Sequence, residues 1–314
     1  MRTRGYGRSG YVAIAIVGAL GFAWMGCATR TEMATAPEAL GKSGAMPLSN
    51  SKSTTSSNDY CNPFTAFDFR NFGNPTRIDN VWSPLAPGRR YVLEGIANRG
   101  TGLVEHKVVF TVTDVVKKVH GIDCLVVWDV DYTQGVLNEA ELAFFAQDND
   151  GNIWTMGEYP EEYDPISGEF QGAPNTWIHG LEGAEAGNLI IANPRVGTGY
   201  YLQGRVDVIK FLDCAKIYKM GEKTCVPTGC YSNVLITDEK SPLEGKGHQR
   251  KFYAPGIGNV RIAAVGDPEG ETLVMTEYRM LTAEELAAAR QEALRLDARG
   301  YQFSDVYALT SVAH

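Results

Sequence analysis

Three side chains with catalytic chemistry lie in the central part of the chain: Glu141, Glu158 and His179. Two carboxyl groups roughly 5 to 9 Å apart act as acid and base in glycoside hydrolysis, and rings such as Trp154 and Trp177 stack on sugars. The register of the hairpin between them decides whether Glu141 faces Glu158. Carboxylates on a solvated strand face show the same pattern, and the sequence favours this second interpretation.

A neighbouring loop carries acidic oxygens in alternation: Asp148, Asp150 and Asn152 around Gly151. Oxygen ligands at this spacing are typical of calcium sites, but the loop lacks the late glutamate of an EF-hand. An Asp-Gly hairpin turn explains the same residues without a metal. Calcium is the one cofactor that the sequence suggests, and the sequence favours the turn.

Composition and absent signatures narrow the function classes further. The formal net charge is −8, which disfavours nucleic acid and anionic lipid surfaces as partners. The sequence has no nucleophile elbow, P-loop, dinucleotide fingerprint or His-Glu-x-x-His motif. These observations favour a binding protein over an enzyme.

The N-terminus indicates export. Three arginines precede an apolar stretch, 11–24, that is too short to span a membrane comfortably. Gly26 and Cys27 follow this stretch, as in a bacterial lipoprotein signal. Trp24 departs from the usual pattern, which has an aliphatic residue at that position. We predict a signal peptide over 1–26 and a lipid such as palmitate on Cys27. An ordinary secretory signal is the alternative.

The predicted anchor leads into a tether and then a folded domain. Residues 27–60 are rich in Ser, Thr, Ala, Gly and Pro and have too few large apolar groups for a core. We therefore expect one β-rich domain over 61–314, held at the cell envelope by its lipid. In a host with two membranes, Ala28 after the cysteine resembles lipoproteins forwarded to the outer membrane.

Five cysteines follow Cys27, and an exported compartment permits disulfides. Cys225 and Cys230 flank a Pro/Gly turn, so the expected bridge joins these two, or Cys214 to one of them. An odd number leaves one thiol unpaired. Zinc ligation by these three cysteines lacks the usual close pairs.

Alternating hydrophobicity predicts an antiparallel sheet. Within 125–132 the aromatic residues share one face and Asp129 and Asp131 share the other, with a turn at His120-Gly121 before them. Further strands are predicted at 107–119, 139–147, 152–158, 200–210, 215–219, 230–237, 251–254, 259–265 and 272–280. The aromatic side chains expected to line the concave face and bind a ligand are Trp128, Tyr132, Phe144 and Trp154.

One helix is predicted near the C-terminus, over 282–299. Thr282 and Glu285 have the spacing of a capping box, and Gly300 is the expected end. Because a large twisted sheet must cover its inner face, we expect a half-barrel closed by this helix or by long loops in 160–194. The predicted fold class is mainly β, a curved antiparallel sheet with a C-terminal helix.

Three segments resemble uncharacterised secreted bacterial proteins: 82–92, 145–154 and 238–260. They look like a first strand, a middle hairpin and a closing hairpin of a curved sheet. In overall architecture such proteins look like half-barrel lipoproteins of the LolA and LppX type. The resemblance implies shelter of a hydrophobic ligand in the concavity, as a fold-level analogy.

The sequence therefore leads to three hypotheses. The first is an exported lipoprotein that binds a hydrophobic or extended ligand without catalysis. The second is an exported hydrolase or lyase that acts on polysaccharide through carboxylates or His179. The third is a structural envelope protein that acts through partners.

Overall fold

The computed structural model describes residues 61–99, 102–243, 247–267 and 269–314. The predicted signal peptide (1–26), the lipid site Cys27 and the tether (27–60) lie outside the described residues. Among the helices that are described, none has the length and apolar character needed to cross a membrane.

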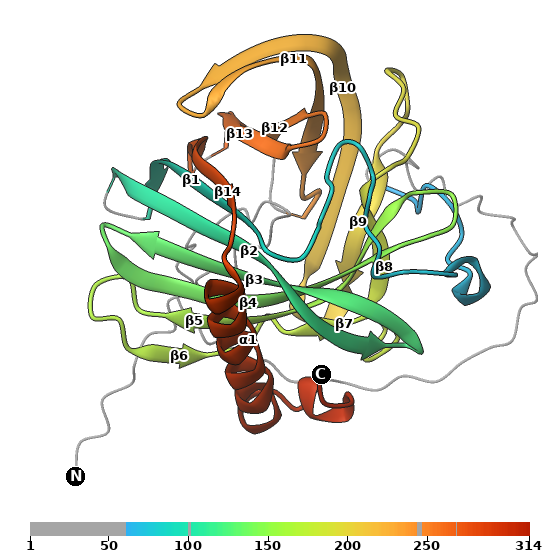
Figure 1. Cartoon of the computed structure of the whole chain (residues 1–314), viewed down its shortest axis with the longest axis vertical. Helices are drawn as coiled ribbons and strands as arrows, with labels where there is room; N and C mark the ends of the chain where they lie inside the picture. The colour runs from blue at the N-terminus through green and yellow to red at the C-terminus, as the bar shows by residue number, and fades with distance from the viewer. Residues whose placement is uncertain (1–60, 100–101, 244–246, 268) are drawn as a thin grey trace, which may run out of the picture.

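Twelve antiparallel strands form a closed barrel (Figure 1). The order around it is β4-β3-β2-β1-β14-β13-β12-β11-β10-β9-β8-β5, and β5 pairs with β4 to close the ring, while β6 and β7 pair with β5 outside this path. The strands are β1 (Arg89–Asn98), β2 (Leu103–Val119), β3 (Ile122–Thr133), β4 (Val136–Gln147), β5 (Ile153–Tyr163), β6 (Phe170–Gly172), β7 (Trp177–Ile178), β8 (Glu185–Ile190), β9 (Tyr201–Val206), β10 (Phe211–Val226), β11 (Gly229–Lys240), β12 (His248–Ala254), β13 (Gly258–Val265) and β14 (Thr272–Met280).

The prediction of a mainly β fold with a C-terminal helix is confirmed, but the half-barrel is wrong. The expected closing loops in 160–194 contain β6, β7 and β8 instead. Closure comes from β5, which pairs with β4 along most of its length and with β8 at its start. Strand pairing satisfies the backbone groups that an open edge would leave exposed.

The tight turn between β2 and β3 follows the prediction. His120 and Gly121 have φ values of 47° and 84°, as a two-residue hairpin turn requires. The turn fixes the register in which Val119 faces Ile122. This register places Asp129 and Asp131 on one face of β3 and Trp128 and Tyr132 on the other.

Helix α1 (Ala283–Phe303) lies across the outside of the barrel and contacts β2, β3 and β4 (Figure 1). The predicted capping box is present, because Thr282 and Glu285 each accept a hydrogen bond from the other's backbone N–H. The short helices are η1 (Phe69–Asn71), η2 (Asp207–Ile209) and η3 (Tyr307–Leu309).

The end of α1 differs from the prediction. Gly300 lies inside the helix, which continues to Phe303. A Cβ at Gly300 would lie 2.4 Å from Cδ1 of Tyr307, so the glycine makes room for a ring rather than ending the helix. Tyr307 is fully buried and donates a hydrogen bond to Asp297 at 2.7 Å, and Lys117 of β2 binds the same carboxylate at 2.7 Å.

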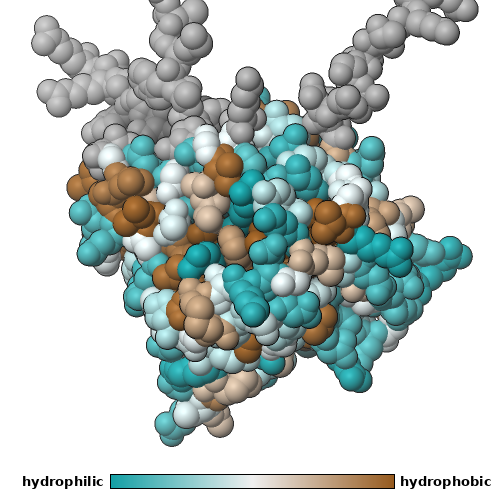
Figure 2. Space-filling view, turned by 90° about the horizontal axis from the view of Figure 1, so that it is seen from above, coloured by the Kyte–Doolittle hydropathy of each residue, from teal (hydrophilic) through white to brown (hydrophobic). Residues whose placement is uncertain are grey.

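Both faces of the sheet are buried on this side of the barrel. One apolar cluster fills the interior, and a second lies between the outer face of β2–β5 and α1. Trp82 and Leu85, in the segment before β1, belong to the interior cluster. On the face seen in Figure 2, exposed hydrophobic residues form several separate groups among hydrophilic ones.

Two disulfides are present. The Cys225–Cys230 bridge confirms the first of the predicted pairings and staples the tip of the β10–β11 hairpin. Cys214 pairs with Cys61, not with either of these two, and so ties the segment before the barrel to β10. Among the described cysteines, the unpaired thiol is Cys124, which is buried. Burial raises the pKa of this thiol, which keeps it protonated and unreactive.

Replacement of Gly300 with alanine tests the packing at the end of α1. An alanine normally stabilises a helix interior by about 1 kcal/mol relative to glycine. Here we expect Gly300→Ala to lower the free energy of unfolding by about 1 to 3 kcal/mol, because its methyl group overlaps the fixed ring of Tyr307. Chemical denaturation measures this. Gly199→Ala is the control, since its Cβ would meet no atom within 4 Å; a stabilised Gly300→Ala would contradict the account.

Candidate ligand site inside the barrel

The strand registers show which side chains point inward. Asp129 and Asp131 of β3 lie opposite Glu141 and Glu139 of β4. Val127 belongs to the interior cluster, and because alternate residues of a strand share a face, Asp129, Asp131 and their partners on β4 also point inward. Towards the other end of the same strands, the inner face carries apolar residues. The interior is therefore divided into an apolar part and a carboxyl-rich part.

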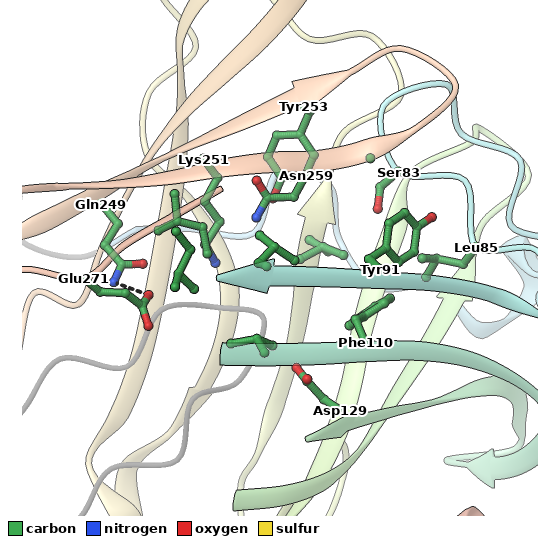
Figure 3. A pocket seen from close by; sticks show the side chains of 16 residues that line it. Ser83, Leu85, Tyr91, Phe110, Asp129, Gln249, Lys251, Tyr253, Asn259 and Glu271 are labelled. Carbon is green, nitrogen blue, oxygen red and sulfur yellow. Dashed lines mark hydrogen bonds between the residues drawn. The ribbon is translucent and has the colours of Figure 1, made fainter. Parts of the chain in front are cut away.

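A cavity of about 70 Å³ lies where these two parts meet (Figure 3). Leu93, Val108 and Leu273 are among its apolar walls, and Asp129 lies across it from Tyr253 in the view of Figure 3. The residues that line it are Ser83, Leu85, Tyr91, Leu93, Val108, Phe110, Asp129, Leu189, Gln249, Lys251, Tyr253, Gly258, Asn259, Ile262, Glu271 and Leu273.

A chain of hydrogen bonds and ion pairs forms part of the polar wall. Gln249 donates to Glu271 at 3.1 Å (Figure 3), and the two ring nitrogens of His106 lie 3.1 Å from Glu271 and from Asp131. Burial opposes the charge of His106, but the two carboxylates outweigh it and raise the pKa of the imidazole. Burial is likewise outweighed at Glu271, where the contact with His106 lowers the pKa. The imidazole of His106 is thus held between two acids that favour its charged form.

The other buried cations of this region are also engaged. Lys251 of β12 lies 2.9 Å from Glu239 of β11, which accepts a further hydrogen bond from Thr237 at 2.6 Å. Arg99 contacts Glu269 at 3.2 Å. Each cation thus has a carboxylate partner other than Asp129.

Asp129, Glu141 and Glu158 make up a second group of inward carboxyls, with exposures of 4%, 0% and 3%. Burial, reinforced by neighbouring carboxyls, raises the pKa of Asp129 and of Glu141 well above the usual range. Burial also raises the pKa of Glu158 to about 7, although the indole N–H of Trp177 donates to it at 2.7 Å. Oδ1 of Asp129 and Oε1 of Glu158 have no hydrogen-bond partner among the described residues. Burial disfavours the ionised form of these groups, and their free oxygens can accept hydrogen bonds from a ligand.

The structure brings two of the three candidate catalytic residues together. Glu158 faces Ala143 and lies diagonally across from Glu141 on the inner face. His179 instead packs against the rings of Phe67 and His120, with centroids 4.3 and 5.1 Å away. Burial lowers the pKa of His179 to about 4, and its Nδ1 accepts the backbone N–H of Ala186.

The four aromatic residues expected to line the concave face point away from the cavity. Phe144 packs on Tyr307, and Trp154 packs on Phe67, both in the outer apolar layer. Trp128 and Tyr132 belong to an apolar cluster on the outer face of β1–β3. Their assignment as lining of the concavity is wrong. The outer face is also covered, by α1 and by the segment before β1, and aromatic side chains can therefore be buried there.

The loop suggested for calcium forms a closed turn. Asp148 accepts hydrogen bonds from the backbone of Asp150, the backbone and side chain of Asn152, and the indole of Trp154. Asp150 accepts one from Asn71. Both oxygens of Asp148 are therefore used by the turn. In the part of the chain that the structure describes, no group of three or more His, Cys, Asp or Glu side chains is placed to hold a metal ion.

Sequence reasoning missed the residues that line the cavity. Asp129 alternates with apolar residues on a predicted strand, Lys251 begins another, and Gln249 and Glu271 lie just outside the predicted strands 251–254 and 272–280. The signal was present in β3, where two acids share a face, but an acidic face was assigned to solvent. Only the closure of the barrel shows that this face is enclosed.

Comparison with known proteins gives limited information. No protein-family model matches the chain, and no curated protein matches it. A candidate lipoprotein from Parabacteroides distasonis ATCC 8503 and a candidate exported protein with a YmcC-like fold from Bacteroides fragilis NCTC 9343 are similar in structure. Each is 14% identical, with 64% of this chain and 99% of the other covered and a TM-score of 0.36. The LolA and LppX type is not shown by these matches.

The buried carboxyls predict an unusual pH dependence of stability. A carboxyl whose pKa is higher in the folded than in the unfolded state stabilises the fold below the unfolded pKa, and this stabilisation is lost as pH rises through the folded value. For Glu158 the window runs from about 4.5 to about 7. We expect the free energy of unfolding to fall across this window, with about 3 kcal/mol of the fall due to Glu158.

Denaturation at a series of pH values measures this fall, and Glu158→Gln is expected to reduce it because glutamine keeps the acceptor for Trp177 without titrating. The exposed carboxylate of Glu185 supplies the control, Glu185→Gln. An unchanged pH dependence in Glu158→Gln would show that Glu158 is ionised throughout the window.

Proposed function

We propose that the domain is a non-catalytic binding protein that holds a compact small molecule inside the barrel. The single observation that carries this proposal is the cavity between the apolar and the carboxyl-rich parts of the interior, with Asp129 on its wall. A mostly apolar space with a few convergent polar groups is the usual form of a small-molecule site. Its walls suit a ligand with an apolar body and a polar end.

The size of the cavity restricts the ligand. An engineered cavity of about 150 Å³ admits benzene, so a cavity of about 70 Å³ holds a molecule of only a few heavy atoms. This favours a compact ligand over the extended or lipid-like one suggested by the sequence. Polysaccharide hydrolysis is also disfavoured, because Glu141 and Glu158 are buried and neither lines the cavity.

Export supports a role in the cell envelope. The disulfides Cys61–Cys214 and Cys225–Cys230 are stable in oxidising compartments and rare in the cytosol. Together with the lipoprotein-like signal that ends at Cys27, they support a lipid-anchored domain outside the cytoplasm. The predicted tether would separate the barrel from the membrane.

A cavity-filling variant tests ligand binding. Leu273 is 1% exposed and lines the cavity, so Leu273→Phe is expected to occupy the space and reduce ligand affinity by tenfold or more, about 1.4 kcal/mol. Saturation-transfer NMR with compact alcohols and amines measures binding. The control is Leu103→Phe, at a position that is 60% exposed. Absence of binding to the wild type, or equal binding by Leu273→Phe, would contradict the proposed function.

The lipid anchor is tested by Cys27→Ala. Loss of the thiol is expected to abolish incorporation of labelled palmitate and to move the protein from the membrane to the soluble fraction, since no acyl chain can then be attached. Cys124→Ala is the matched cysteine control, because this thiol is buried and free. A Cys27→Ala variant that stays in the membrane fraction would rule out anchoring through this residue.

A further inference from the structure

We propose that the ligand of the barrel is a compact organic ammonium ion whose charged group is bound by Asp129 and whose apolar body lies against Leu93 and Leu273. This inference rests on the proposed function and adds the chemical class of the ligand. It is carried by the cavity wall, where a buried carboxyl group faces a mostly apolar space (Figure 3).

The first argument is hydrogen bonding. Asp129 is 4% exposed, lines the cavity, and its Oδ1 has no partner among the described residues. Glu141 lies directly opposite on β4 and adds a second buried carboxyl group beside it. Buried polar atoms without partners are costly and rare in folded proteins. An ammonium group offers three donors and no acceptor, which matches a site that presents acceptors.

The second argument is charge. The cations nearest the cavity each have a carboxylate partner already: Lys251 pairs with Glu239, and His106 lies between Asp131 and Glu271. An anionic ligand would meet the carboxyls of Asp129 and Glu141 with no free cation among the described residues to balance it. A neutral alcohol would satisfy one acceptor only. A cation therefore fits the interior better than either.

The third argument is proton balance. The charged groups that act on Asp129 are Asp131 of the same strand, Glu141 of β4, Glu271 just before β14 and Lys251 of β12. Burial and Asp131 raise the pKa of Asp129, so a carboxylate without a nearby cation of its own is disfavoured in the empty site. A bound ammonium ion compensates that charge, because the ion pair it forms with the carboxylate is neutral overall.

A metal ion is the competing cation. Metal sites need several ligands at fixed spacing, and no group of three or more His, Cys, Asp or Glu in the described ranges has it. The apolar walls also give a bare ion nothing to contact, whereas they suit the carbon skeleton of an amine. The observations therefore favour the organic cation.

Three probes with one carbon skeleton test the inference: isobutylammonium, isobutanol and isobutyrate. Titration followed by NMR or calorimetry is expected to show that the ammonium ion binds the wild type about 10- to 100-fold more tightly than the alcohol, as charge-assisted hydrogen bonds do. Isobutyrate is expected not to bind. Asp129→Asn keeps the shape of the side chain and is expected to remove the preference for the amine while alcohol binding stays. Asp123→Asn, at an exposed carboxylate paired with Lys118, is the control.

The outcomes separate the two proposals. Equal affinity for amine and alcohol, or an unchanged preference in Asp129→Asn, overturns the ammonium inference and leaves the binding function standing. Absence of binding by all three probes overturns both. Displacement of the amine by Ca²⁺ or Mn²⁺ at equal concentration would identify a metal site and overturn the inference. If Asp129→Asn binds no probe, Glu141→Gln serves as the second variant, with a reduced preference for the amine expected and an unchanged one contradicting the inference.

Discussion

The pairing of β4 with β5 is the contact on which the rest of the structure depends. It joins the two ends of a twisted sheet into a ring of twelve strands, so that the inner faces of β3, β4 and β5 are enclosed. A closed barrel leaves no exposed strand edge, and its interior must be filled by side chains or by a ligand. The acids on the inner faces of β3, β4 and β5 are buried for this reason alone.

Enclosure gives these acids their chemistry. On an open sheet Asp129, Glu141 and Glu158 would be solvated carboxylates of ordinary acidity. Inside the barrel the loss of water raises their pKa values, and the available cations are already paired with other acids. The interior therefore combines an apolar core with carboxyl groups whose oxygens are only partly hydrogen-bonded. This combination is the basis of the proposed ligand site.

Local features of the fold were predictable because they depend on neighbouring residues. The His120-Gly121 turn, the capping box at Thr282 and the Cys225–Cys230 bridge each arise within a few residues. The end of α1 was not predictable, because the role of Gly300 depends on the ring of Tyr307, which packs against it from the segment after the helix. The Cys61–Cys214 bridge spans 153 residues and has no local signal.

The sequence by itself determined most of the strands, the helix, one disulfide and the place of Glu141 and Glu158 on one hairpin. Alternation separates the two faces of a strand, but it does not say which face points inward when both are covered. Only the tertiary structure decided that the aromatic face lies under α1 and that the acidic face lies inside. The reason is that inside and outside are defined by closure between strands distant around the ring, and no single strand carries that information.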